Sequence, residues 1–258
     1  MSALTVYAML FAGGIFVTML LLVEAGRRLG KRHAARVGAE SRAGLGLVDS
    51  AVYALLGLMI AFTFSAAFSR FDTRRNLIVQ EANAIGTAYL RIDLLPADVQ
   101  PRVRELFRRY LDSRLATYQK LPDVDAALKE YENTSRLQQE IWTEAVEGTR
   151  EMASPAPAQL LLSALNEMID ITTTRLMATR LHQPTVVFAM LGILSLSAAL
   201  LAGYGMASGK RSTIHNLLFA TVVAVTIYLI IDLEYPRLGL IRVDEVDQVL
   251  HDLRGSMK

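Results

Sequence analysis

Residues 50–91 read SAVYALLGLMIAFTFSAAFSRFDTRRNLIVQEANAIGTAYLR, and no proline interrupts the chain from there until Pro96. The first part of this stretch, between Asp49 and Arg70, holds 20 uncharged residues. A helix of about 20 mostly apolar residues covers the roughly 30 Å of hydrocarbon in a bilayer. The second part carries charges but no helix breaker. The sequence therefore predicts one continuous helix of over 40 residues that leaves the membrane and continues into water.

Three further runs without charge are long enough to cross a bilayer. They lie between Met1 and Glu24, between His182 and Lys210, and between Arg211 and Asp232. A cleaved signal peptide is the alternative for the first run, but no Lys or Arg precedes it and the run is full length. We therefore predict an all-α membrane protein with four transmembrane helices, at residues 1–25, 49–69, 184–208 and 212–232.

The charged residues concentrate between the second and third predicted spans. Prolines divide this part into helical pieces, because proline lacks a backbone donor and clashes with the preceding turn. We expect helices at about 70–94, 99–119, 123–152 and 157–183. Together they would form a helical extramembrane domain at 70–183, inserted between the second and third spans. A basic loop at 26–48 and a C-terminal tail at 233–258 complete the predicted layout.

The second of these pieces, at 99–119, has one apolar stripe with spacings of three and four. The stripe contains Val103, Leu106, Phe107, Tyr110, Leu111, Arg114, Leu115 and Tyr118.

Two short loops between the predicted spans are rich in cations and lie on the same side of the membrane. The first contains Arg27, Arg28, Lys31, Arg32, Arg36 and Arg42, and the second contains Lys210 and Arg211. The positive-inside rule favours a cytoplasmic position for such loops, which would place the middle domain outside. Arginines close to the span ends on the other side keep the opposite orientation open.

The second predicted span has two kinds of stripe. Gly57, Ala61 and Ser65 recur at steps of four, a small-residue pattern that lets helices approach closely. Large side chains form two other stripes, of which one contains Ile60, Phe64 and Phe68 and the other contains Ala54, Leu58 and Phe62. A ring of such side chains around a symmetry axis can gate an ion pathway by dewetting. Either stripe can instead face lipid or neighbouring helices.

The same span and its extension resemble a segment of the bestrophins, in which an apolar span ends in an Arg-aromatic pair followed by Arg, Leu and Asn. The matching positions are Arg70, Phe71, Arg75, Leu77 and Asn83. Together with DLEYPRLGLIRV at 232–243, the segment closely resembles the bacterial bestrophin-like membrane family, described as a domain of unknown function. The chain departs from the bestrophins in lacking a tryptophan pair after the arginine, since Asp72 replaces the second aromatic residue.

The resemblance implies a homo-oligomeric ion channel, a pentamer of four-span subunits whose second spans line the pore. Counting back from Arg70 as in bestrophins puts Leu58 and Phe62 in an apolar neck, whereas the spacing of large residues favours Ile60, Phe64 and Phe68. The implied location is the bacterial inner (plasma) membrane, with membrane lipid, inorganic ions and copies of the chain itself as partners. Bestrophins place the middle domain in the cytoplasm, so the two orientations stay open.

Ionisable residues gather at one predicted membrane edge. Arg70, Arg74 and Arg75 follow the second span, and Asp232 and Glu234 close the fourth on the same side. Because a charge near lipid is costly unless it is paired or hydrated, we predict a clamp in which Asp232 pairs with one of the three arginines. A role in ion selection is the alternative.

Motifs of enzyme chemistry do not occur in this sequence. It has neither HExxH nor GxSxG, and GYGMASGKRS at 203–212 lacks the spacing of a phosphate-binding loop. The chain has no cysteine, and we expect no metal, no cofactor and no catalytic residues. A net charge of +2 is too small to indicate nucleic acid as a partner. The alternative to a channel is a membrane-anchored helical sensor or scaffold protein without a pore.

Overall fold

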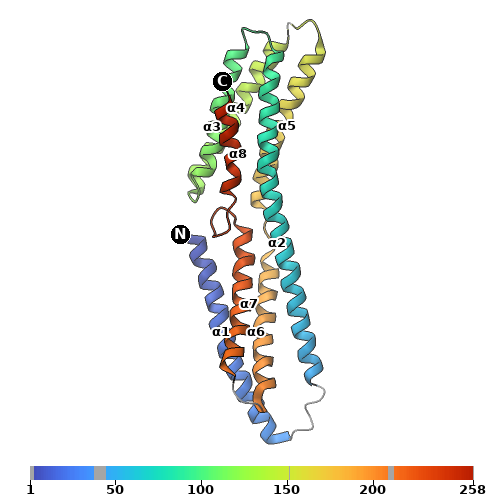
Figure 1. Ribbon diagram of the computed structural model, residues 1–258, viewed down its shortest axis with the longest axis vertical. Coiled ribbons are helices and arrows are strands. Elements are labelled where there is room, and N and C mark those ends of the chain that lie inside the picture. Colours follow the sequence, from blue (N-terminus) through green and yellow to red (C-terminus); the bar gives the residue numbers. More distant parts are fainter. Residues whose placement is uncertain (1–2, 38–44, 151, 209–211, 258) are drawn as a thin grey trace. The chain divides into compact units, whose positions relative to one another are not determined.

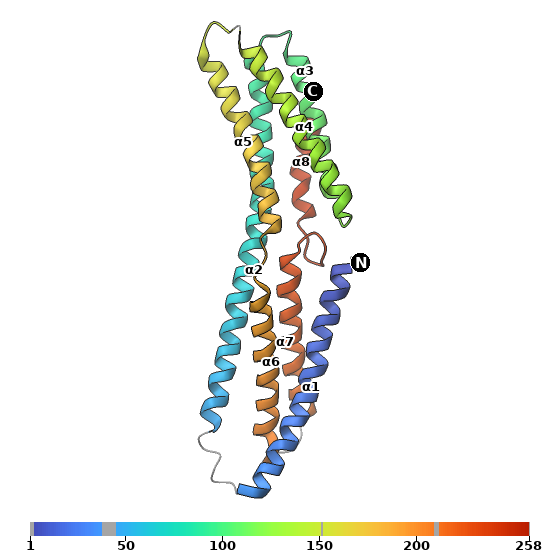
Figure 2. The ribbon, with the colours of Figure 1, turned by 180° about the vertical axis from the view of Figure 1, so that it is seen from behind.

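The computed structural model describes residues 3–37, 45–150, 152–208 and 212–257, and helices make up most of them (Figure 1, Figure 2). No strand occurs in these ranges, so the predicted all-α fold is confirmed. The α-helices are α1 (Ala3–Val37), α2 (Leu45–Leu90), α3 (Gln100–Gln119), α4 (Val124–Thr149), α5 (Pro155–Arg180), α6 (Thr185–Gly205), α7 (Thr213–Glu234) and α8 (Gln248–Ser256). Three cations of the predicted basic loops, Arg42, Lys210 and Arg211, lie outside the described residues.

The chain folds into two compact units. The first comprises Met1–Arg70 and His182–Ile241, and the second comprises Phe71–Leu181 and Arg242–Lys258. Helix α2 contributes to both units because it runs unbroken from Leu45 to Leu90. The predicted continuous helix is therefore present.

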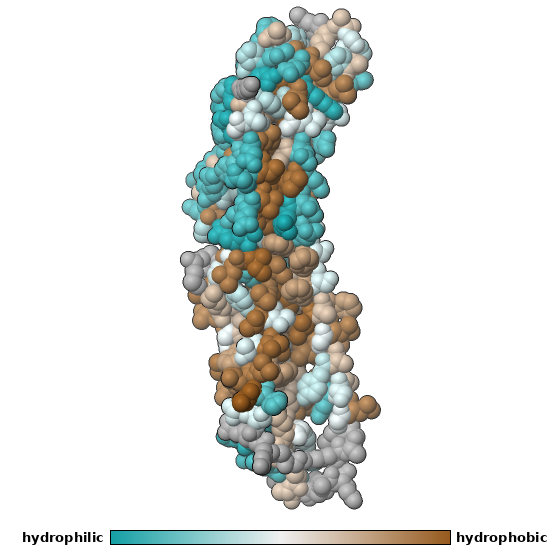
Figure 3. Space-filling model, in the orientation of Figure 1, coloured by the Kyte–Doolittle hydropathy of each residue, from teal (hydrophilic) through white to brown (hydrophobic). Residues whose placement is uncertain are grey.

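Four helical segments are long and apolar enough to cross a membrane, which matches the predicted number of spans. They are Thr5–Ala35, Gly46–Leu94, Pro155–Gly205 and Thr213–Glu234. The third segment joins α5 and α6, which residues 181–184 separate. Apolar surface, brown in Figure 3, covers much of the first unit, whereas polar surface, teal in the same view, covers much of the second.

Helices α1 and α6 approach each other closely at two glycines. A Cβ atom added at Gly26 would lie 2.0 Å from the carbonyl oxygen of Leu200, and one added at Gly203 would lie 1.9 Å from that of Val23. Because real Cβ atoms do not make such contacts, both positions require glycine. A Cβ atom at Gly57 would meet no described atom within 4 Å. The tightest glycine-mediated packing of the first unit therefore involves α1 and α6, not the small-residue stripe of α2.

The second unit has an apolar core between its helices. Its fully buried side chains include Phe107, Tyr110 and Leu111 of α3, Ile141 of α4 and Leu165 of α5. The first three belong to the stripe predicted for 99–119, so that stripe faces the core as expected.

Prolines and one cap set the helix starts of this unit. Pro101 lies in the first turn of α3, and α5 begins at Pro155, where the missing backbone donor costs nothing. At the start of α4, the Asp123 carboxylate accepts a hydrogen bond of 3.0 Å from the backbone nitrogen of Ala126. The expected helical pieces therefore occur with small differences at their ends.

Candidate functional site

The apolar half of α2 buries only one narrow face within this chain. Leu56, Thr63 and Ala67 are buried, with exposed fractions of 4%, 2% and 0%. The five pore candidates all lie outside that narrow face: Leu58, Phe62, Phe64 and Phe68 are exposed, and Ile60 is half-buried.

The two candidate stripes differ in their position around the helix. Successive residues of an α-helix turn by about 100°, which places Leu58 about 160° from the centre of the buried face and Phe64 about 80° from it. Phe62 and Phe68 both lie about 120° from that centre, on opposite sides of the helix. The rings of Phe64 and Phe68 stack on each other, with centroids 6.4 Å apart. Phe62 is the most exposed of the set, at 66%. Taken as pairs, Leu58 and Phe62 therefore point further from the buried face of α2 than Phe64 and Phe68 do.

At the end of the α2 segment in the first unit, Arg70 forms an ion pair with Glu234, the last residue of α7. The Arg70 Nε atom donates to Glu234 Oε1 at 2.9 Å, and Arg70 Nη2 donates to Gln183 Oε1 at 2.7 Å. The Nδ1 atom of His182 lies 3.5 Å from Glu234 Oε2, and the His182 ring stacks on Tyr235. The Glu234 side chain is 1% exposed and that of Arg70 is 28% exposed, so this partly buried pair joins α2, α7 and the segment before α6.

The structure differs from the prediction at Asp232, which pairs with none of the three arginines in the described part of the chain. The Asp232 carboxylate accepts hydrogen bonds from the backbone nitrogens of Leu240 and Ile241, at 2.9 and 2.7 Å, and from the Tyr228 hydroxyl at 3.2 Å. A Cβ atom at Gly239 would lie 2.1 Å from Asp232 Oδ1. Asp232 therefore holds the turn after α7, because backbone donors close in sequence satisfy its charge.

The other two arginines of the predicted clamp have different roles. Arg74 is buried and donates to the carbonyl oxygens of Ala178 and Leu181, at 3.0 and 2.9 Å, where α5 ends. The last carbonyl groups of a helix lack partners within the helix, so a cation there stabilises the end. The guanidinium group of Arg75 lies 5.9 Å from the ring centre of Phe71.

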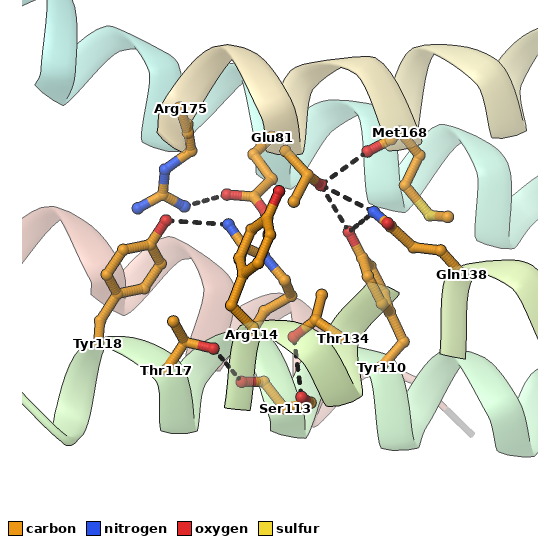
Figure 4. Close-up of polar contacts among 12 residues, drawn as sticks. Glu81, Tyr110, Ser113, Arg114, Thr117, Tyr118, Thr134, Gln138, Met168 and Arg175 are labelled. Atoms are coloured by element: carbon orange, nitrogen blue, oxygen red, sulfur yellow. Dashed lines mark hydrogen bonds and ion pairs between the residues drawn. The ribbon is translucent and has the colours of Figure 1, made fainter. Parts of the chain in front are cut away.

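A buried charge cluster that the sequence analysis did not predict lies in the second unit (Figure 4). Glu81 of α2 is fully buried between Arg114 of α3 and Arg175 of α5, which are 1% and 4% exposed. Arg114 Nε donates to Glu81 Oε1 at 2.5 Å, and Arg175 pairs with Glu81 Oε2. Tyr118 accepts from Arg114 Nη2 at 2.9 Å, and its ring lies under the Arg175 guanidinium. Three helices are thereby joined by one carboxylate.

Two arginines on one carboxylate leave an excess positive charge, and Asp247 partly offsets it. Its Oδ1 atom lies 3.8 Å from Arg175 Nη2. Next to this cluster, the hydroxyls of Tyr110 and Thr172 are 3.0 Å apart, and Gln138 Nε2 donates to Thr172 Oγ1 at 3.0 Å. The cluster thus continues into a layer of satisfied polar groups.

The electrostatics of the cluster favour its charged form. Burial alone would raise the pKa of the Glu81 carboxyl, but Arg114 and Arg175 lower that pKa from 4.5 to about 2. Burial, followed by the charge of Glu81, raises the pKa of Tyr110 to about 12. Glu81 therefore stays ionised at neutral pH, while Tyr110 stays neutral.

One feature of the sequence could have indicated this cluster, although no counter-charge was predicted from it. Arg114 falls within the apolar stripe of α3, and a cation on a core-facing stripe needs a buried counter-charge. The sequence did not indicate that Glu81 and Arg175, distant along the chain, would supply the rest. Among the described residues no group of three His, Asp or Glu side chains could hold a metal ion.

Comparison with known proteins places this geometry in a family. A variant of a bacterial bestrophin homolog from Klebsiella pneumoniae has a similar crystal structure, with a TM-score of 0.67 and 16% identity over 93% of this chain and 99% of that chain. Another structure of the Klebsiella homolog gives a TM-score of 0.63 at 17% identity, over 93% and 98%. A crystal structure described only as that of a membrane protein gives 0.63 at 18%, over 93% and 99%. The search of curated proteins gave no match.

The chain therefore has the bestrophin fold. The family model for the Bestrophin-like domain matches residues 13–247, which is most of the sequence. The chain belongs to this Bestrophin-like family, and the resemblance noted from residues 55–91 and 232–243 is confirmed.

Proposed function

We propose that this chain is one subunit of a homo-oligomeric ion channel in which the second membrane helix, at residues 49–69, lines the pore. One observation carries the proposal: the face of α2 opposite its buried face presents Leu58 and Phe62 together with the small residues Ala61 and Ser65. Small residues let neighbouring helices approach, and closed cyclic symmetry would then bring one such face from every subunit to a common axis. Membership of the Bestrophin-like family supports a channel and, by likeness to bestrophins, a pentamer.

Within this proposal, Leu58 and Phe62 form an apolar neck. Apolar side chains around a narrow axis exclude water and so oppose ion passage without any charge. Ile60, Phe64 and Phe68 form the less favoured set, since Ile60 and Phe64 lie closer to the buried face and the rings of Phe64 and Phe68 stack on each other. The Arg70–Glu234 pair would fix the end of the pore helix against α7.

The proposed layout places spans at 1–25, 49–69, 184–208 and 212–232 in the bacterial inner membrane, with residues 70–183 as an extramembrane helical domain. Polar surface over the second unit supports that placement (Figure 3). The proposed partners are membrane lipid, inorganic ions and further copies of the chain.

Ion flux tests the proposal. The unaltered protein, Phe62→Ala and Phe64→Ala are reconstituted in liposomes under a salt gradient, after the oligomer has been verified by its mass. We expect Phe62→Ala to raise the flux about tenfold, which corresponds to a barrier lower by about 1.4 kcal/mol. Phe64→Ala is the matched control, because it removes the same side chain from the other stripe, and its flux should stay close to that of the unaltered protein.

Two results would contradict parts of this proposal. A larger rise with Phe64→Ala than with Phe62→Ala would assign the neck to the other stripe. Absence of flux from all three proteins, with the oligomer intact, would exclude the channel and favour the membrane-anchored sensor or scaffold.

A further inference from the structure

A second feature of the first unit lies at the ends of α1 and α6, which run side by side (Figure 1, Figure 2). A cavity of about 500 Å³ opens there, and it is lined by Leu29, Arg32, His33, Leu200, Leu201 and Tyr204. It lies just beyond Glu24, where the uncharged run of α1 ends, and close to Gly205, where α6 ends. The cavity is therefore at a proposed membrane edge.

Glycines bring α1 and α6 close together next to this cavity. A Cβ atom at Gly26 or Gly203 would collide with the other helix, and one at Gly30 would lie 2.6 Å from the Tyr204 carbonyl oxygen. Leu29 on one helix, half exposed, and Leu200 on the other border this space, which no side chain of the described residues fills.

The lining has one apolar wall and one cationic side. Three leucines form the wall, and the rings of His33 and Tyr204 lie together with centroids 6.1 Å apart. Arg32 supplies the cation and makes no ion pair with any residue that the structure describes. Arg28 of the same helix differs, because its Nε atom lies 3.1 Å from Glu24 Oε1.

We propose that this cavity binds an anionic phospholipid, with the headgroup phosphate at Arg32 and the start of an acyl chain against the leucine wall. Basic pockets between membrane helices favour anionic headgroups. An aliphatic wall favours the lipid over a free anion, because a small hydrated ion gains nothing from contact with leucine and loses water there. The volume lies in the range of ordinary ligand pockets and suits part of a lipid.

Lipid titration of the full chain in detergent, followed by native mass spectrometry, tests this site without any measurement of ion flux. Phosphatidylglycerol is compared with phosphatidylcholine of the same acyl chains and with inorganic phosphate. We expect the unaltered protein to bind phosphatidylglycerol in preference to both. Arg32→Gln should weaken that binding about fivefold, which corresponds to about 1 kcal/mol for one cation near the membrane surface.

Arg28→Gln is the matched control, because it removes the same charge from the same helix on a side chain paired to Glu24. We expect it to change the affinity less than twofold. Leu201→Trp should fill the cavity and weaken phosphatidylglycerol binding with every charge retained. If this variant does not yield folded protein, the comparison of Arg32→Gln with Arg28→Gln decides alone.

Three results would overturn the proposal. Equal binding of the two lipids would mean that no anionic headgroup is recognised. Equal losses in Arg32→Gln and Arg28→Gln would mean diffuse attraction by the basic helix end instead of a site. Inorganic phosphate that binds as tightly as phosphatidylglycerol would assign the cavity to a soluble anion. None of these results depends on whether the protein conducts ions.

Discussion

Replacement of Glu81 by Gln should strongly destabilise the second unit. The variant keeps the shape of the side chain but removes the only carboxylate that lies directly between Arg114 and Arg175 in the described structure. The lowering of the Glu81 pKa from 4.5 to about 2 corresponds to about 3 kcal/mol in favour of the ionised form. Measured losses on breaking buried ion pairs are of the same order, about 3–5 kcal/mol. For a unit of this size, 3 kcal/mol lowers the unfolding midpoint by roughly 10 °C.

Circular dichroism of the full chain in detergent measures this loss. Glu140→Gln is the control, because it breaks an ion pair with Arg136 that is exposed to solvent and is worth less than about 1 kcal/mol. The reasoning is refuted if the unfolding midpoint of Glu81→Gln differs from that of the unaltered protein by no more than the midpoint of Glu140→Gln does. Such a result would mean that the two arginines find other partners at little cost.

The same pair gives a pH dependence with a definite sign. The folded-state pKa of Glu81 is lower than its ordinary value, so its contribution to stability is fully present above about pH 4.5. It decreases as the pH falls from 4.5 through about 2. The difference in unfolding midpoint between the unaltered protein and Glu81→Gln should therefore shrink over this window.

Two further predictions concern the first unit. Gly203→Ala should lower the unfolding midpoint by several degrees, because its Cβ atom would collide with the Val23 carbonyl oxygen; Gly13→Ala, whose Cβ atom would meet nothing within 4 Å, should leave it unchanged. Arg70→Gln should cost about 3 kcal/mol in the same measurement, because Glu234 is left buried with a weaker partner, and a loss below 1 kcal/mol would mean that other groups hold it.

The fold followed from the sequence because its causes are local. Runs without charge predict helices of membrane length, and the unbroken stretch up to Pro96 predicts a helix such as α2. Proline and Asp123 mark helix starts through their own backbone chemistry. The close contact at Gly26 and Gly203 did not follow, since a glycine pattern shows that a close approach is permitted but not which helices make it.

The buried cluster could be predicted only in part. Arg114 on an apolar stripe indicated that a counter-charge was required, which is information within one helix. Its partner Glu81 lies on α2 and the second arginine lies on α5, so the pairing depends on how three helices pack. One sequence offers many acidic residues that could fill that role equally well.

The clamp prediction paired residues of opposite charge at the same predicted membrane edge. That criterion could not choose between Asp232 and Glu234 as the partner of an arginine. Two residues apart on a helix, the two side chains point about 200° apart, so only one of them can face Arg70. A further clue lay in the turn that begins after Glu234, because the backbone N–H groups that follow Gly239 need an acceptor nearby. Asp232 meets that need at Leu240 and Ile241, which leaves Glu234 for the arginine. An acidic residue just before such a turn is therefore better assigned to the turn than to a distant cation.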